Sequence, residues 1–148
     1  MESKEDLTER KKMAWDALFY SVQRMDLLII TISGAGLYVI LETLKYSMDK
    51  PLCCLWVIKA SGAIFVSAII VNFISQHTGK KCNHHDMLWC EEKIYFDNPP
   101  TAAQLQKAQN HDTHAEIYST VTKWFNLGSM ILMFIALISL VLYFLIIF

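Results

Sequence analysis

The fold is decided by residues 27–75, where two apolar runs flank a short polar turn. The runs are LLIITISGAGLYVILETL (27–44) and LCCLWVIKASGAIFVSAIIVNFIS (52–75). As a helix, each is about long enough to cross a hydrocarbon core roughly 30 Å thick. A third apolar run, residues 127–148, carries no charged residue. The sequence therefore predicts an all-α membrane protein with three transmembrane helices, of which the first two form a hairpin.

The composition supports a membrane protein over a soluble one. Only 18% of the 148 residues are charged, against about 25% in ordinary soluble domains. The charged residues crowd into residues 1–26 and 76–126. A net charge of −1 provides no basic field for nucleic acid, so we expect no direct nucleic-acid partner.

The cysteines favour a reducing compartment. Cys53, Cys54, Cys82 and Cys90 have no disulfide-framework spacing, and such thiols are typical of proteins that are kept reduced.

Residues 1–26 are predicted to form an amphipathic helix. Trp15, Leu18, Val22 and Met25 recur at three- and four-residue spacing and would share one apolar face. The helix would lie at the membrane interface or pack on neighbouring subunits; the alternative is a solvated lead-in. Because this charged segment precedes the first span, we expect that span to be a retained signal-anchor rather than a cleaved signal peptide.

Small residues in the hairpin favour close helix packing. Gly34 and Gly36 lie near the middle of the first run, and Ala60, Ala63 and Ser67 share one face of the second. A neighbouring face of the second run also carries small or polar residues, namely Ser61, Ala68 and Asn72. Small residues let helix backbones approach in lipid. We therefore expect tight packing within the hairpin, with a face left for other subunits.

Two charged residues interrupt the apolar runs, Glu42 in the first and Lys59 in the second. Charges inside a membrane are costly and often mark a functional site. In an antiparallel hairpin they would lie close enough to pair, or their long side chains could reach the membrane edge. The alternative is that Glu42 and Lys59, with Asn72, line a polar pathway in an oligomer.

The distribution of basic residues predicts the orientation. Residues 1–26 and 76–126 each carry five Lys or Arg, and the turn 45–51 carries two. Basic residues accumulate in cytoplasmic segments. We therefore expect a multi-pass protein of the cell inner membrane, with the N-terminus and residues 76–126 in the cytoplasm and the C-terminus outside.

Within residues 76–126, Pro99 and Pro100 are expected to interrupt helical structure, because a residue before proline is disfavoured in helical geometry. Thr101 and Gln104 have the spacing of a capping box, so a helix is predicted from about Thr101 into the last span. That last span, with Leu, Ile, Phe and Met in every direction, is expected to be a peripheral, lipid-facing helix without the small-residue faces of the hairpin.

The polar segment supplies the candidates for binding chemistry. Its histidines are His77, His84, His85, His111 and His114. Histidine and thiolate are good zinc ligands, but the most closely spaced candidates match no standard zinc pattern: Cys82, His84, His85 and Cys90. We therefore expect no metal and no cofactor, and a His-rich segment with pH sensitivity. No catalytic arrangement is present, so the protein is not expected to be an enzyme.

Three basic residues follow the second apolar run directly: His77, Lys80 and Lys81. They could contact anionic lipid or a nucleotide messenger at the cytoplasmic membrane surface. The simpler interpretation is that they are solvated charges that flank a span.

The layout also carries a family resemblance. Residues 9–26 run directly into the apolar run 27–44, which the turn 45–51 follows. In this layout the chain resembles small membrane effectors of bacterial antiviral systems, including SLATT-type two-span proteins and CRISPR-associated membrane accessory proteins. The resemblance implies an oligomer that permeabilises or depolarises the inner membrane when triggered.

Two functions follow from these observations. The first is a homo-oligomeric, pore-forming or channel-like effector in the lipid bilayer, with a cytoplasmic protein or a nucleotide messenger as its trigger. The second is a non-conducting membrane adaptor that binds a cytoplasmic partner through residues 86–123.

Overall fold

The structure is all-helical over the residues it describes. The computed structural model describes residues 4–49, 55–94, 99 and 101–147, and in the first helix the side chains of Asp16, Phe19, Tyr20 and residues 22–47. The helices are α1 (Lys4–Asp49), α2 (Leu55–Ile94) and α3 (Ala102–Ile147). The predicted apolar face of residues 1–26 depends partly on Trp15 and Leu18, whose side chains lie outside the described set.

Each helix is uninterrupted because none contains proline. Residues 1–26 and the first apolar run, which the sequence treats as separate segments, therefore share one helix, which has 46 residues and is about 69 Å long. The predicted capping box precedes α3: the Thr101 amide donates to Gln104 Oε1 (2.9 Å), and the Gln104 amide donates to Thr101 Oγ1 (3.4 Å).

All three helices are long and apolar enough to cross a membrane. We call residues 27–47, 55–75 and 127–147 the apolar half of the molecule, and residues 76–94 and 102–126 the polar hairpin. Two carboxyl groups lie near the ends of this apolar segment of α1: Asp26 and Glu42 are 16 positions apart, which is about 24 Å along the helix.

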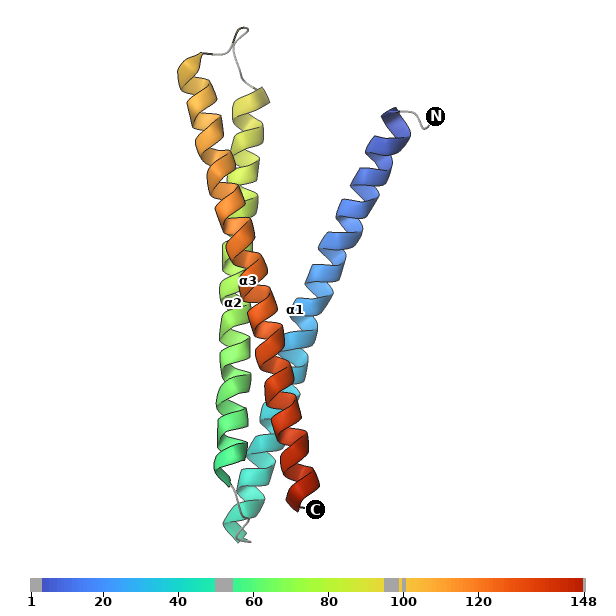
Figure 1. Cartoon of the computed structure of the whole chain (residues 1–148), viewed down its shortest axis with the longest axis vertical. Coiled ribbons are helices and arrows are strands. Elements are labelled where there is room, and N and C mark those ends of the chain that lie inside the picture. Colours follow the sequence, from blue (N-terminus) through green and yellow to red (C-terminus); the bar gives the residue numbers. More distant parts are fainter. Residues whose placement is uncertain (1–3, 50–54, 95–98, 100, 148) are drawn as a thin grey trace.

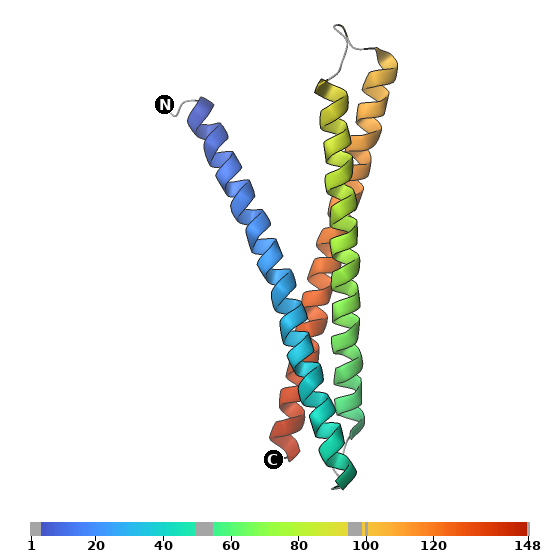
Figure 2. The same ribbon diagram turned by 180° about the vertical axis from the view of Figure 1, so that it is seen from behind.

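The helices α2 and α3 form one long antiparallel pair, and α1 joins them over the apolar half only (Figure 1). Towards its N-terminus α1 leans away, so that the molecule has the shape of a V, which the opposite view also shows (Figure 2). The packing core therefore lies mainly between α2 and α3, whereas the sequence favoured the hairpin of the first two spans.

A seven-residue repeat of small side chains explains why α2 and α3 pair. On α3 the repeat consists of Ala108, Ala115, Thr122, Ser129 and Ala136. On α2 it consists of Ser61, Ala68, Ser75 and Cys82. All of these side chains are buried or half-buried. A strict seven-residue repeat keeps one seam of each helix facing its partner through a left-handed supercoil.

Two side-chain bonds to the opposite backbone define the register of this seam. Ser75 Oγ donates to the Thr122 carbonyl (3.1 Å), and Cys82 Sγ donates to the Ala115 carbonyl (3.3 Å). Short side chains reach the partner backbone only when the two helices approach closely, and residues of this size permit that approach.

The seam corrects the expectation for the last span. Ser129 and Ala136, both 0% exposed, lie in the buried seam of α3, so α3 is the main partner of α2 and not a peripheral helix. The last span contains only two members of the seven-residue repeat, Ser129 and Ala136, because the others lie in the polar hairpin. The repeat is therefore not recognised when the last span is considered alone.

The core of the apolar half consists mainly of apolar side chains from all three helices. Its buried apolar residues are Ile29, Ile40, Ile58, Phe65, Ala68, Met133, Ala136, Leu140 and Tyr143. The ring of Phe65 lies directly on Gly36, where an added Cβ would be 2.5 Å from ring atoms Cε2 and Cζ. Gly36 thus provides the space for the largest buried side chain in the contact between α1 and α2.

Candidate functional site

A cleft with mixed polar and apolar walls opens where α1 leaves the α2–α3 pair. It has a volume of about 590 Å³ and is lined by all three helices. Its polar lining residues include Gln23, Asp26, Gln76, Lys80, Asn83 and Asn126. Phe19, Val22 and Leu27 supply an apolar wall from α1. We call this space the interfacial cleft, because it lies at one edge of the apolar half.

A hydrogen-bonded network joins two lining residues of the interfacial cleft, Asp26 on α1 and Gln76 on α2, through Asn72 of α2. Asn72 is 0% exposed, and its Nδ2 donates to Asp26 Oδ1 (2.9 Å). Gln76 Nε2 in turn donates to Asn72 Oδ1 (3.0 Å). A buried amide needs such partners because an unpaired one costs about 1–3 kcal/mol. The network therefore holds α1 against α2 at the level where the two helices diverge.

Hydroxyl groups continue this polar layer between α2 and α3. Thr122 Oγ1 lies 2.8 Å from Thr78 Oγ1 and 2.7 Å from the Tyr118 carbonyl. Asn126 Oδ1 is buried and has no hydrogen-bond partner within the described part of the chain. The layer therefore retains an acceptor that a ligand or water in the cleft could satisfy.

The lining of the interfacial cleft carries groups that can bind a polar ligand. Its described lining combines the Lys80 ammonium and the Asp26 carboxyl group with several amides. These groups recognise a polar ligand through hydrogen bonds and charge.

A second cluster, centred on His85, lies in the seam of the polar hairpin. His85 Nδ1 is 3.2 Å from His111 Nδ1. The His85 ring stacks on His114, with ring centroids 5.1 Å apart, and on Tyr118, at 5.6 Å. Partial burial lowers the pKa of His85, and positive charge on His114, His111, His84 and Lys81 lowers it further. His85 is therefore harder to protonate than a free histidine.

The predicted intramembrane charges are separate in this structure. The side chains of Glu42 and Lys59 are both exposed at the surface of the chain. Among the described residues the only ion pair is that of Lys107 with Glu92, near the end of the polar hairpin. Glu42 and Lys59 therefore do not pair within one chain, and the predicted salt bridge between them is wrong for the single chain.

The predicted small residues divide between two environments. Gly36 is buried against Phe65, while Gly34 is exposed and would have nothing within 4 Å of an added Cβ. Ala60, Ala63 and Ser67 are exposed on α2. The neighbouring face of α2, with Ser61, Ala68 and Asn72, is buried within the chain.

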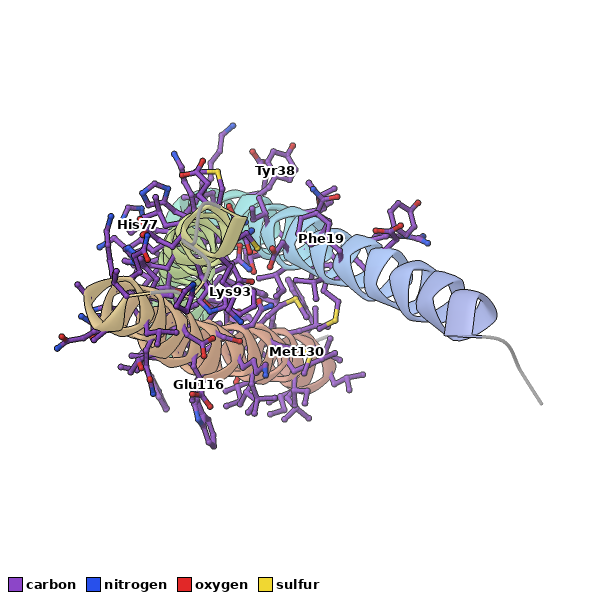
Figure 3. All side chains as sticks on the ribbon, turned by 90° about the horizontal axis from the view of Figure 1, so that it is seen from above. Phe19, Tyr38, His77, Lys93, Glu116 and Met130 are labelled. Atoms are coloured by element: carbon purple, nitrogen blue, oxygen red, sulfur yellow. The ribbon has the colours of Figure 1, made fainter. Side chains whose placement is uncertain are left out.

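The basic residues after the second span also separate. Lys80 lines the interfacial cleft. His77 lies on the side of α2 that faces away from α1 (Figure 3), and Lys81 Nζ lies over the Tyr118 ring, 5.6 Å from its centroid. The structure therefore does not gather His77, Lys80 and Lys81 into one site.

The cysteine and histidine candidates for metal binding do not converge either. Within the described residues, no three His, Cys, Asp or Glu side chains are placed to hold one ion. The predicted candidates Cys82, His84, His85 and Cys90 are among the residues to which this applies. Burial, with the nearby Asp86 carboxylate, raises the pKa of Cys82, so this thiol stays protonated. Cys90 is exposed on the same helix.

Sequence reasoning missed two features of the site. It assigned no role to Asp26 or Gln76, because their pairing through Asn72 depends on how α1 and α2 meet. It noted His111 but did not join it to His85. The seven-residue repeat, extended through the whole of α3, was the signal that could have placed them opposite each other.

No family model, curated protein or solved structure matches this chain. Any functional assignment therefore depends on the geometry above, and the resemblance to antiviral membrane effectors stays a prediction.

Proposed function

We propose that this protein is a homo-oligomeric, pore-forming or channel-like membrane effector. The observation that carries the proposal is the uncovered small-residue face of α2, formed by Ala60, Ala63 and Ser67. The other small-residue face of α2 is already occupied by α3 through the seam. In lipid, helices associate through such faces because bilayer chains supply no hydrophobic drive. A second copy of the chain is the partner that fits.

Conduction would belong to the assembly and not to a single chain. Ile58, Phe65 and Leu140 fill the space between the three helices, so one chain has no polar path through its apolar half. In an oligomer, exposed polar groups such as Glu42 and Lys59 could face one another or water. This arrangement would also offset the cost of charges near lipid.

The interfacial cleft is the proposed trigger site. With residues 1–26 and the polar hairpin in the cytoplasm, as the basic residues predict, the cleft opens to the cytoplasm at the inner membrane edge. A ligand between α1 and α2 could change the angle at which α1 leaves the pair. Membrane permeabilisation in antiviral defence is the role that the family resemblance suggests for such a protein.

The test uses the full chain reconstituted in liposomes, with ion flux and particle size as measurements. Ser67→Leu should block close approach of a second copy and reduce both oligomer content and flux, by about tenfold for a loss of roughly 1.4 kcal/mol of association energy. Val66→Leu is the matched control, since Val66 is an adjacent exposed residue outside the small-residue face.

A monomeric particle and a tight bilayer, for the unmodified chain, would refute this function. Equal effects of Ser67→Leu and Val66→Leu would refute the proposed interface.

One observation favours the adaptor as a second candidate. Leu105 and Ile117 are half exposed on α3 within the polar hairpin, where no lipid would cover them. Exposed apolar side chains on a rigid helix pair suit a protein partner. An adaptor would co-purify with that partner without conducting ions, and Ile117→Asp in the full chain would release it.

A further inference from the structure

The seam of the polar hairpin brings two imidazole rings together from opposite helices. His85 Nδ1 of α2 and His111 Nδ1 of α3 are 3.2 Å apart. Small residues on either side of this layer, including Ala108 and Ala115, let the helix backbones approach closely enough for the rings to meet.

This separation is close to the one that two ligands of a single metal ion adopt. Nitrogens bound to zinc at about 2.0–2.1 Å in tetrahedral geometry lie roughly 3.3–3.4 Å apart. Without an ion, the same approach requires one ring to donate its proton to the other. The two Nδ1 atoms are therefore spaced so that a metal ion could take the place of the proton shared between them.

The surroundings of His85 limit the movement of its ring. His85 is half-buried, and the charges that face it are Lys81 and His84 on α2, and His111 and His114 on α3. Tyr118 stacks on the ring, with an interplanar angle of 13°, and limits its rotation.

His114 is the available third ligand. It lies one turn beyond His111 on α3, and its ring stacks on His85 with centroids 5.1 Å apart. Its side chain is exposed, so the ring has room to turn. Because no three ligands converge in the present arrangement of the described residues, His114 must rotate to complete the set.

We propose that His85 and His111 form the cross-helix pair of a binding site for a divalent transition metal such as Zn²⁺, with His114 as the third ligand. A bound ion would link α2 to α3 in the middle of the polar hairpin. It would thereby hold the register of the hairpin. This site is separate from the interfacial cleft and does not depend on the proposed pore function.

The test is a Zn²⁺ titration of the full chain in detergent, followed by calorimetry. We expect one tightly bound ion per chain, with affinity at least about tenfold weaker in His85→Gln and in His111→Gln. His84→Gln is the matched control, since it removes the neighbouring histidine of the same helix. Cys82→Ser with Cys90→Ser tests for binding through these thiols.

A second measurement keeps the proposal testable if a variant fails to fold. In the unmodified chain, Zn²⁺ should protect His85 and His111 from diethyl pyrocarbonate, while exposed His77 stays reactive. Absence of Zn²⁺ binding, binding unchanged in both His→Gln variants, or equal reactivity of His85 with and without Zn²⁺ would overturn the proposal. Loss of binding in the Cys→Ser variant alone would also overturn it.

Discussion

Two glycines near the middle of α1 should respond in opposite ways to the same substitution. At Gly36, an added Cβ would lie 2.5 Å from the Phe65 ring, where carbon atoms normally stay about 3.5–4.0 Å apart. The ring would have to move by more than about 1 Å. Phe65 is 0% exposed, so its ring is surrounded by other atoms and cannot move aside into solvent. Overpacking of this kind costs about 1–3 kcal/mol.

At Gly34, the same methyl group meets nothing within 4 Å. Alanine is better than glycine inside a helix by about 0.5–1 kcal/mol, because glycine loses more backbone freedom on folding. We therefore expect Gly36→Ala to destabilise the chain and Gly34→Ala to leave it unchanged or slightly more stable. Because both variants gain the same helix preference, they should differ by the overpacking cost alone, about 1–3 kcal/mol in the free energy of unfolding.

The assay is reversible unfolding of the full chain in mixed detergent, followed by circular dichroism, with all variants compared at one protein concentration. A double variant identifies the cause: Phe65→Leu should cost much less in the Gly36→Ala background than alone, since the smaller side chain relieves the clash. Equal effects of Gly34→Ala and Gly36→Ala, or simple additivity of Gly36→Ala with Phe65→Leu, would refute this account of the contact between α1 and α2.

Three further predictions concern the cleft, the seam and the histidines. Asn72→Ala should weaken the attachment of α1 by about 1–3 kcal/mol, since it removes the bond to Asp26; faster hydrogen exchange near Asp26 would measure this, and unchanged exchange would contradict it. Ala136→Leu should cost about 1–3 kcal/mol of stability by overfilling the seam, whereas the exposed Ile138→Leu should cost little; similar unfolding midpoints would exclude a close-packed seam. Because the pKa of His85 is lowered in the folded chain, its contribution to stability is complete above about pH 6.5 and falls as the pH drops below that value. Urea unfolding of the polar hairpin at neutral and mildly acidic pH checks the direction, and His85→Gln should reduce the difference.

Sequence alone was sufficient for the number of long apolar helices and for the start of α3. Hydropathy and the absence of proline act locally, and so does the reciprocal bonding of Thr101 and Gln104. Each depends on residues a few positions apart, which a single chain displays directly. The three candidate spans can therefore be predicted without knowing how the helices pack.

Only the tertiary structure decided which helices pack together and which faces they use. Gly34 and Gly36 are two positions apart in the same apolar run, yet Gly34 is exposed and Gly36 lies against the Phe65 ring. His85 and His111 are 26 positions apart and meet only because the α2–α3 seam has one particular register. In an apolar segment most faces are hydrophobic, so composition does not identify the buried one. Partner choice instead depends on backbone approach along the whole helix, which small residues at seven-residue spacing control.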